Sequence, residues 1–387
     1  MPSSPPPTAS NQRAAVAIFR APLFNSSETF IRNQAAALVR HRPVFVGLEA
    51  KADATPDEAV PMVLPSNRAE RAAFSLLGRV GAIAERLRSH APVLIHAHFG
   101  PDGLAALPLA RALGVPLVTT LHGYDVGRSR RAMLLSGRLS WTRYALARDR
   151  LMRGGALFLA VSEAVRRRAV AQGFPADRTF VHHVGVDLGR FRPDPDKAEP
   201  GLILHVGRLV EKKGTAVLIE AFARLRREGR DTRLVVIGDG PERAALERSA
   251  VVPELAGRVD FLGEISPDEV AAWLRRAWLI AAPSVTARDG DAEGLPTVLV
   301  EAAASGVPAV ATDHMGNAEA VIDGRSGLLV GERDPAALAA ALARLLASAA
   351  LRAEFAKAAR SHAERAFDLA RQTEVLERHY DRVAGLG

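Results

Sequence analysis

Residues 292–308 read AEGLPTVLVEAAASGVP and hold two glutamates, Glu293 and Glu301, with seven residues between them. Pro296 fits the first turn of a helix, where its missing N–H removes no hydrogen bond. Glu293 then lies in the loop before the helix, and Glu301 about a turn and a half inside it. The unpaired N–H groups of a first turn favour an anion such as a diphosphate. Because two glutamates at this spacing are also common on solvated helix faces, the pair needs support from elsewhere in the chain.

Two stretches upstream give that support. Residues 205–214 read HVGRLVEKKG, which places Arg208 at the end of an expected strand and Lys213 at the start of the next helix. Together these cations can neutralise the charge that builds on a nucleoside diphosphate leaving group, although two surface cations near a turn are the alternative. Residues 236–241 read VIGDGP, a strand followed by a glycine turn. This turn lacks the third glycine of the dinucleotide fingerprint, so NAD is excluded.

Apolar runs alternate with helix-patterned stretches along the whole chain. This alternation predicts an α/β protein with parallel sheets covered by helices on both faces. The stretch 190–201 (RFRPDPDKAEPG) contains three prolines and reads as a linker. The expected strands are 14–20, 43–49, 92–98, 116–122, 156–162, 179–185, 202–208, 233–239, 259–263, 278–284, 309–312 and 327–330.

The linker divides the chain into two Rossmann-like, doubly wound domains of similar size. We expect a disordered tail at 1–13, a first domain at 14–190, a linker at 191–201 and a second domain at 202–365. Two such domains facing each other form a cleft between the carboxyl ends of their sheets, where ligands of this architecture bind.

Composition excludes several classes of protein. The 387 residues contain no cysteine, which removes disulfide scaffolds, thiol nucleophiles and iron–sulfur clusters. No apolar run reaches the roughly 18 residues of a membrane-spanning helix, and the Pro/Ser-rich start is unlike a secretory signal. We therefore expect a cytoplasmic protein.

Charge is distributed unevenly around a total of +8. Residues 1–195 carry 26 Lys and Arg against 14 Asp and Glu, whereas residues 196–387 carry 25 against 29. No helix-turn-helix, zinc finger or aromatic RNA-binding stripe accompanies the basic half, so nucleic acid is not expected. An anionic membrane surface or an acidic acceptor explains the imbalance equally well.

Taken together, residues 205–214, 236–241 and 292–308 resemble the donor domain of the retaining GT-B glycosyltransferases of family 4. These enzymes carry an E-x7-E pair, a G-R-L…K-G element and a G-x-G-P turn. The resemblance extends from about residue 14 to the C-terminus. It implies a GT-B fold in which a C-terminal helix, 366–387, crosses back to the first domain.

The resemblance also implies an activity. It predicts transfer of a hexose from a UDP- or GDP-linked sugar to a saccharide or a polyprenyl-diphosphate-linked acceptor, in exopolysaccharide, capsule or lipopolysaccharide biosynthesis. Neither a cofactor nor a metal ion is expected. The alternatives are a catalytically idle GT-B scaffold subunit and a nucleotide-sugar epimerase or hydrolase, which would turn over without an acceptor.

Donor-site residues follow from the same resemblance. Glu301 would bind the ribose hydroxyls, Glu293 would lie against the donor sugar, and Arg208 and Lys213 would hold the diphosphate. Further donor contacts are implied for the backbone of Gly294 and Leu295, at the sugar or the phosphates, and for Gly316 and Asn317.

In the first half, residues 120–125 read TLHGYD and follow an expected strand. They resemble the H-G-x-D motif of the family, whose histidine contacts the donor sugar across the cleft. The resemblance assigns this role to His122 and places Asp125 near the same sugar. A histidine at a strand end can also be purely structural.

Residues 25–30 read NSSETF and resemble the S-E-T-F segment of members that assemble bacterial polysaccharides. The resemblance places Ser27, Glu28 and Thr29 on the acceptor side. Ser27 and Thr29 can equally be helix caps.

Two further patterns point to metal ions, and neither is accepted. His96 and His98 share one face of a strand but have no acidic partner at ligand spacing, so we expect them to pack and line the cleft, with His98 on the acceptor side. Asp289-Gly290-Asp291 matches the D-x-D metal motif of the other major glycosyltransferase fold, whereas GT-B enzymes use cations and helix dipoles for that charge.

The stretch 127–154 contains eight arginines and one acid. Leucines recur in it at helical spacing, which predicts a basic amphipathic helix that can lie on an anionic membrane. The protein would then work at the inner face of the cell membrane. The alternative is a surface helix packed on its own domain.

Overall fold

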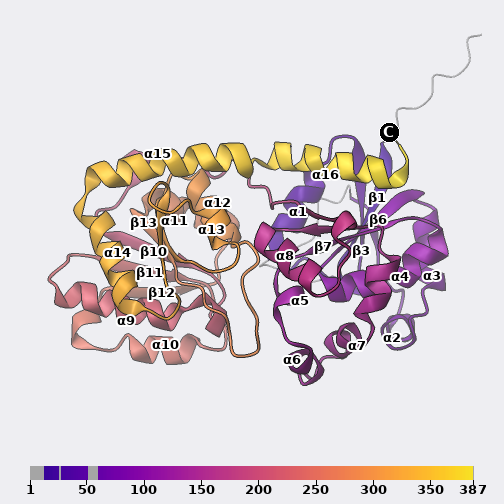
Figure 1. Ribbon diagram of the computed structural model, residues 1–387, viewed down its shortest axis with the longest axis horizontal. Coiled ribbons are helices and arrows are strands. Elements are labelled where there is room, and N and C mark those ends of the chain that lie inside the picture. Colours follow the sequence, from indigo (N-terminus) through magenta and orange to yellow (C-terminus); the bar gives the residue numbers. More distant parts are fainter. Residues whose placement is uncertain (1–12, 26–27, 51–59, 387) are drawn as a thin grey trace, which may run out of the picture.

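The computed structural model describes residues 13–25, 28–50 and 60–386. Figure 1 shows two α/β domains side by side, each built on a parallel sheet with helices on both faces. This is the predicted architecture of two Rossmann-like domains. Of the predicted tail, only Arg13 belongs to the described residues, and Ser27 lies outside them.

The first sheet has the strand order β5-β3-β1-β6-β7-β8-β9, with all neighbours parallel. Val16 and Ile18 of β1 pack into one buried cluster, whereas Ala17 and Phe19 pack into another, so both faces of the sheet are covered. The elements are β1 (Ala14–Phe19), β3 (His41–Val46), β5 (Met62–Val63), β6 (Pro92–His98), β7 (Leu117–Leu121), β8 (Leu157–Ala160), β9 (Thr179–Val181), α1 (Thr29–Ala36), α2 (Arg68–Leu77), α3 (Gly81–Arg88), α4 (Gly100–Leu113), α5 (Tyr124–Gly127), α6 (Arg130–Leu134), α7 (Leu139–Gly154) and α8 (Glu163–Ala171).

The second sheet has the order β12-β11-β10-β13-β14-β15 and is also parallel. Ile203 packs on one face of β10, and Leu202 and Leu204 pack on the other. The elements are β10 (Leu202–Val206), β11 (Arg233–Ile237), β12 (Val259–Gly263), β13 (Leu279–Ala282), β14 (Ala309–Thr312), β15 (Gly327–Val330), α9 (Thr215–Arg227), α10 (Arg243–Ser249), α11 (Pro267–Arg276), α12 (Thr297–Ala304), α13 (Asn317–Ala320), α14 (Pro335–Ala347) and α15 (Ala349–Ala366).

All twelve predicted strands are present, and the largest difference in bounds is at 179–185. There β9 ends at Val181, because the chain leaves the sheet and Val186 pairs with Asp368 instead. Three two-residue strands were not predicted, since two residues show no periodicity: β5, β2 (Pro22–Leu23) and β4 (Glu49–Ala50).

The C-terminal helix α16 (Leu369–Ala384) crosses back to the first domain, as predicted for 366–387. Figure 1 shows α15 and α16 running along one side of both domains. Glu377 of α16 accepts hydrogen bonds from the N–H groups of Val39, Arg40 and His41. Tyr380 is fully buried, and its hydroxyl lies 2.6 Å from Nδ1 of His96 on β6.

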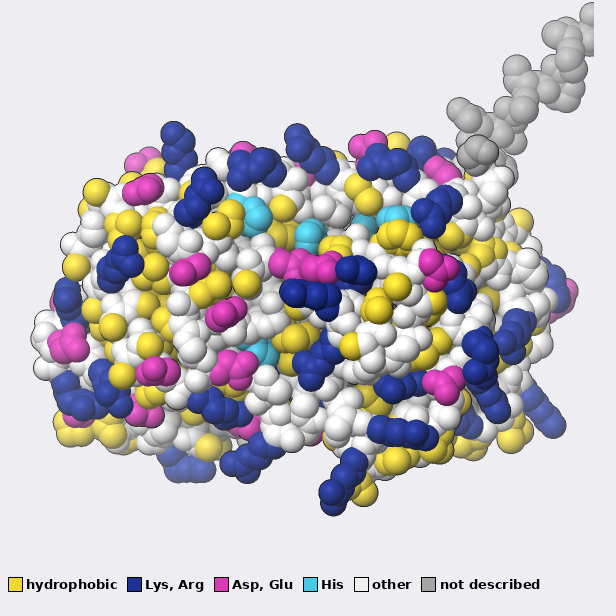
Figure 2. Space-filling model, viewed as in Figure 1, with side chains coloured by type: hydrophobic (Ala, Val, Ile, Leu, Met, Phe, Trp, Pro, Cys, Tyr) yellow, Lys and Arg dark blue, Asp and Glu magenta, His cyan; other side chains and the backbone are white. Residues whose placement is uncertain are grey.

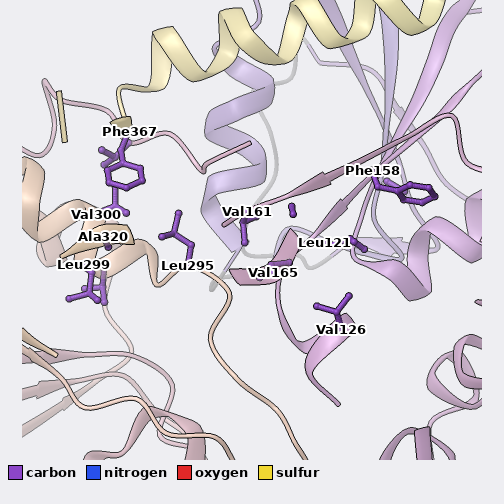
Figure 3. Packing of buried hydrophobic residues seen from close by; sticks show 14 of the residues in the cluster. Leu121, Val126, Phe158, Val161, Val165, Leu295, Leu299, Val300, Ala320 and Phe367 are labelled. Carbon is purple, nitrogen blue, oxygen red and sulfur yellow. The ribbon is translucent and has the colours of Figure 1, made fainter. Parts of the chain in front are cut away.

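The two domains share one hydrophobic core. Leu121, Val161 and Val165 of the first domain belong to the same buried cluster as Leu295 and Leu299 of the second. Figure 3 shows these side chains lying between the two sheets. The centre of the contact between the domains is therefore made of buried apolar side chains from both.

The stretch 127–154 is not the single helix that was predicted. It contains the end of α5, then α6 and α7, and residues 135–138 separate the last two. Gly137 has φ +68, which ends helical geometry. Trp141 and Tyr144 are buried, whereas Leu135 and Leu146 are 73% and 62% exposed.

Among the described helices, none is by itself long and apolar enough to span a bilayer. The pair α14 and α15 meets that criterion only jointly, with a bend of 102° between its members.

Candidate functional site

The loop between β13 and α12 carries Glu293 to the boundary with the first domain. Pro296 immediately precedes the first residue of α12, one position earlier than predicted. Glu293 is 8% exposed, and its carboxylate pairs with two lysines. Its Oε2 lies 3.0 Å from Lys213 Nζ, and its Oε1 lies 3.3 Å from Lys212 Nζ without hydrogen-bond geometry.

The two lysines fix the charge of this carboxylate. Burial raises the pKa of Glu293, but Lys212 and Lys213 outweigh it and lower the pKa to about 2. Glu293 is therefore ionised throughout the physiological pH range. It can accept hydrogen bonds from sugar hydroxyls, but a carboxylate this weakly basic is a poor general base near neutrality.

A histidine that was not predicted holds the backbone of Glu293. The N–H of Glu293 donates to His314 Nε2 at 3.2 Å, so the ring proton lies on Nδ1, which donates to Glu332 Oε1 at 2.6 Å. His314 follows β14 and Glu332 follows β15. Their positions at strand ends were the only sequence signal for them.

The two predicted cations lie after β10. Lys213 ends the short 3-10 turn η5 (Glu211–Lys213), and its stem covers Gly207, where an added Cβ would be 3.0 Å from Lys213 Cε. Gly214 has φ +65, and a Cβ there would meet Pro283 O at 1.9 Å, so only glycine allows this tight turn into α9. Arg208 is exposed and has no ion pair with any described residue, which leaves it free for an anion.

Glu301 lies inside α12, as predicted, and the residue is half-buried. No described residue forms a hydrogen bond with it. Burial raises the pKa of Glu301 to about 7, although Arg190 and Lys213 act in the opposite direction. A carboxylate that is desolvated and without a partner is suited to a ligand that brings its own hydrogen-bond donors.

Gly294 lies where three segments meet. A Cβ on Gly294 would be 2.0 Å from His122 O, one on Gly123 would be 2.6 Å from Gly294 N, and one on Gly316 would be 1.9 Å from Gly294 O. Ser162 Oγ donates to Gly294 O at 2.8 Å. These contacts bring the predicted loops of both domains together and leave no room for side chains at the three glycines.

His122 belongs to a histidine cluster. Its Nε2 lies 3.1 Å from Nδ1 of His98, and the His98 ring lies 4.4 Å from that of His96, so the pair shares one strand face as predicted. Burial lowers the pKa of both His98 and His122 well below the ordinary value, so both are neutral near pH 7. Among the described residues, no three His, Asp or Glu side chains form a group able to hold a metal ion.

Asp125 has its hydrogen bonds within its own domain. It is fully buried and accepts hydrogen bonds from the N–H groups of Gly100, His122 and Gly123 at 2.9–3.2 Å. Desolvation outweighs these bonds and raises the pKa of Asp125 to about 6. The carboxylate therefore holds the loop that carries His122.

The side chains of Asn317 and Leu295 are buried, and for Leu295 only a backbone contact was predicted. Asn317 is fully buried and donates to Thr312 O at 3.0 Å, and its Oδ1 has no partner among the described residues. The side chain of Leu295 is 7% exposed and belongs to the shared core. At Leu295 and Gly316, only the backbone remains for a ligand.

The predicted acceptor segment is fixed by Arg20, at the end of β1. Arg20 forms a bidentate pair with Glu28 and lies 2.7 Å from Asp102 Oδ2 at the start of α4. Thr29 is the first residue of α1 and does not cap it. Glu28 thus orders the segment through Arg20, which sequence reasoning did not identify.

The D-x-D pair has cationic partners. Arg128 of the first domain lies 2.8 Å from Asp289 and 3.5 Å from Asp291, and Lys212 Nζ lies 3.2 Å from Asp291 Oδ1. These aspartates bridge the domains.

A second polar bridge joins α13 to α8. Glu319 accepts hydrogen bonds from the N–H groups of Glu163 and Ala164 and from His183 Nε2 at 2.9–3.2 Å. Figure 2 shows acidic, basic and histidine side chains gathered where the two domains meet.

Comparison with known proteins decides the family. The second domain matches the model for glycosyl transferases group 1 over residues 190–362, and the first matches that for glycosyltransferase family 4 over residues 27–190. The amylovoran biosynthesis glycosyltransferase AmsK of Erwinia amylovora is 32% identical over 78% of this chain and 76% of its own length. The chain belongs to glycosyltransferase family 4.

Two further comparisons bear on this family 4 glycosyltransferase. The protein named as the colanic acid biosynthesis glycosyltransferase WcaL of Escherichia coli is 39% identical over 64% of the chain, and the matched part spans 60% of the length of WcaL. The crystal structure of Anabaena HepE with UDP and glucose superposes with a TM-score of 0.77 at 21% identity, covering 95% of this chain and all of HepE. The latter likeness establishes the GT-B fold.

Proposed function

We propose that this family 4 glycosyltransferase moves a hexose from a UDP- or GDP-linked sugar to a hydroxyl group of a saccharide or lipid-linked saccharide. The transfer retains the anomeric configuration and serves polysaccharide biosynthesis. One observation carries the proposal: the ionised Glu293 is fixed between Lys212 and Lys213. Arg208, on the loop between β10 and these lysines, is exposed and without an ion pair in the described structure. The names of WcaL and AmsK, both of polysaccharide biosynthesis, support the pathway class.

In this mechanism each group acts on a different part of the donor. Arg208 and Lys213 neutralise the charge that develops on the leaving diphosphate. Glu293 accepts hydrogen bonds from the hexose through the oxygen that lacks a hydrogen bond, and Glu301 accepts them from the ribose. His122, neutral and anchored by His98, meets the hexose from the first domain. Contact between the domains excludes water and so favours transfer over hydrolysis. No step requires a metal ion or a cofactor.

The test is a transfer assay with purified protein. UDP- and GDP-linked hexoses are each incubated with and without a mixture of saccharide and polyprenyl-diphosphate-sugar acceptors, and nucleotide release and glycosylated product are quantified. We expect product and acceptor-dependent nucleotide release with one donor class. Release that is independent of acceptor indicates a hydrolase or epimerase, and binding without turnover indicates an idle scaffold.

We also propose that the enzyme binds its acceptor at the surface of an anionic membrane. Five arginines of α6, α7 and the segment between them are exposed and have no ion pair within the described chain. Six exposed leucines accompany them, and Figure 2 shows basic and apolar side chains along the edge where Figure 1 places α2, α6 and α7. The residues are Arg130, Arg131, Arg138, Arg150, Arg153, Leu76, Leu77, Leu134, Leu135, Leu139 and Leu146.

Vesicle sedimentation tests this contact. We expect binding to vesicles with 30 to 40 per cent phosphatidylglycerol (about that fraction gives a strongly negative surface) and no binding to phosphatidylcholine alone. The double variant Arg130→Glu/Arg131→Glu should lose binding, whereas Arg248→Glu, at an exposed arginine of the second domain, should retain it. Equal binding by both variants removes the proposal.

A further inference from the structure

The turn at residues 287–291 presses the second domain against the first. Ala287 N–H donates to Asp291 O at 2.9 Å, and Gly290 N–H donates to Ala287 O at 2.8 Å. An added Cβ on Gly127 of the first domain would lie 2.9 Å from Gly290 O, so the two backbones are in direct contact. Asp289 and Asp291, the D-x-D pair that was not accepted as a metal motif, lie on this turn.

Charged side chains continue from this contact toward the site. Arg128 pairs with Asp289 and Asp291, Lys212 pairs with Asp291 and Glu293, and Lys213 pairs with Glu293. Arg128 also contacts its own domain, since its guanidinium lies 5.2 Å from the centre of the Trp141 ring. Arg128 is the one member of this chain of charges that the first domain contributes, among the residues that the structure describes.

Lys212 connects the contact between the domains with Glu293, because its ammonium lies between two carboxylates. Its ammonium lies 3.2 Å from Asp291 and 3.3 Å from Glu293. In a partly buried site, charges at these distances interact strongly, so the balance between the carboxylates sets where the ammonium lies. Without the Arg128 charge, Asp291 attracts Lys212 more strongly, and Glu293 loses part of its support.

We propose that Arg128 is a positioning residue of the first domain, which sets the position of the Glu293 carboxylate through Asp291 and Lys212 when the domains are in contact. Transfer then becomes efficient only with both domains together. The inference rests on the proposed function, because it assigns Glu293 to the donor sugar.

Steady-state kinetics of three variants test it. Arg128→Gln should lower kcat about tenfold with little change in donor KM, since misplacing a group near the reacting centre slows chemistry more than binding. Arg128→Lys keeps the charge and should recover most of the loss. Arg248→Gln, an exposed arginine of α10 without an ion pair in the described structure, should match the wild type. An unchanged kcat in Arg128→Gln, beside an active wild type, overturns the proposal.

A double variant tests the route. If Arg128 acts through Asp291, the pair Arg128→Gln/Asp291→Asn should be no slower than the slower single variant, whereas independent roles predict that the two losses multiply. Multiplied losses therefore overturn the route through Asp291.

Hydrogen exchange gives a readout that needs no turnover. Amides of the peptide covering 286–294 should exchange faster in Arg128→Gln than in the wild type and Arg248→Gln, because the turn loses its attachment to the first domain. Unchanged exchange overturns the attachment. Absence of transferase activity in the wild type would contradict the proposed function instead, and the exchange result would still decide the role of Arg128.

Discussion

The two domains differ in whether their charged side chains have partners within the protein. In the second domain, Arg208 is exposed without an ion pair and Glu301 is without a hydrogen bond, each within the described structure. In the first domain, Arg20 is paired with Glu28 and Asp102, and Asp125 accepts three backbone N–H groups. One domain leaves charges available to a ligand, whereas the other uses them to fix its own loops.

This difference makes opposite predictions for substitutions. Removing a free charge in the second domain should reduce catalysis or donor binding and leave the fold intact. Removing a satisfied charge in the first domain should reduce stability, since its partners are then buried without hydrogen bonds. The predictions for Arg208, Glu301 and Asp125 test the two sides of this comparison. Those for Glu293 and Glu319 extend it to charges of the second domain that already have partners.

The largest effect is expected for Glu293→Gln. We expect kcat to fall by a factor of about 10² to 10³, the usual loss when a preorganised charged group is removed from an active site. Because the pKa of Glu293 is about 2, the loss should be the same at pH 6 and pH 9. Steady-state rates at both pH values measure it, and Glu220→Gln, at an exposed glutamate of α9, is the control. A loss confined to one end of this range contradicts a permanent charge at Glu293.

Arg208→Ala should come next, with kcat lower by a factor of about 10 to 100, because the leaving diphosphate loses one cation. The melting temperature should stay within about 2 °C of the wild type, since an exposed surface substitution changes stability little. Kinetics and thermal unfolding on one preparation check both statements. A large drop in melting temperature would show that Arg208 has a structural partner.

Asp125→Asn tests the first domain. The amide keeps one acceptor oxygen, but its NH₂ group then faces a backbone N–H, so we expect destabilisation of about 1 to 3 kcal/mol. Urea unfolding measures this loss, with Asp149→Asn, at an exposed acid of α7, as the control. Unchanged stability would contradict the structural role assigned to Asp125.

The variant Glu301→Gln tests how pH affects nucleotide binding and protein stability. The pKa of Glu301 is raised to about 7, so the native state keeps a proton that the unfolded chain releases near pH 4.5, and stability falls as pH rises from 4.5 to 7. Binding to ribose hydroxyls needs the ionised form, so nucleotide affinity should fall as pH drops below 7. Calorimetry with the preferred nucleotide at pH 6 and 8 should show this dependence in the wild type and not in Glu301→Gln, which should also melt higher at pH 8.

The sequence predicted best what depends on local pattern. All twelve main strands and the positions of Glu293, Glu301, Arg208 and Lys213 on loops and helices follow from apolar runs, turn residues and strand ends. The motif in the first domain predicted that His122 lies at the boundary, but not that Asp125 faces inward. Motif spacing fixes a residue on its loop, whereas burial depends on contacts with distant segments.

The residues that were missed act between distant parts of the chain. Arg20 meets Asp102 across 82 positions, His314 supports Glu293 across 21, and Arg128 pairs with aspartates of the other domain. No local period or motif encodes such pairs. A single Arg or His in the sequence does not indicate which distant residue it contacts. The broken helix at 127–154 has a local cause, since Gly137 adopts a positive φ that a leucine pattern does not reveal.

The smallest effect is expected for Glu319→Gln, at the boundary itself. Glu319 reaches across to the two N–H groups that begin α8 and to His183, and although burial raises its pKa, these partners lower it overall. Losing the charge at a helix start costs about 1 kcal/mol, which lowers the melting temperature by about 2 to 4 °C. A lowered pKa means that the stabilisation is present above pH 4.5 and disappears as pH falls through the native value. Melting temperatures of the two proteins should therefore differ at pH 7 and converge in acid. A difference that persists in acid would show that Glu319 acts through packing rather than through its charge, and the ion pairs of Arg128 would then be the charged contacts left to this part of the boundary.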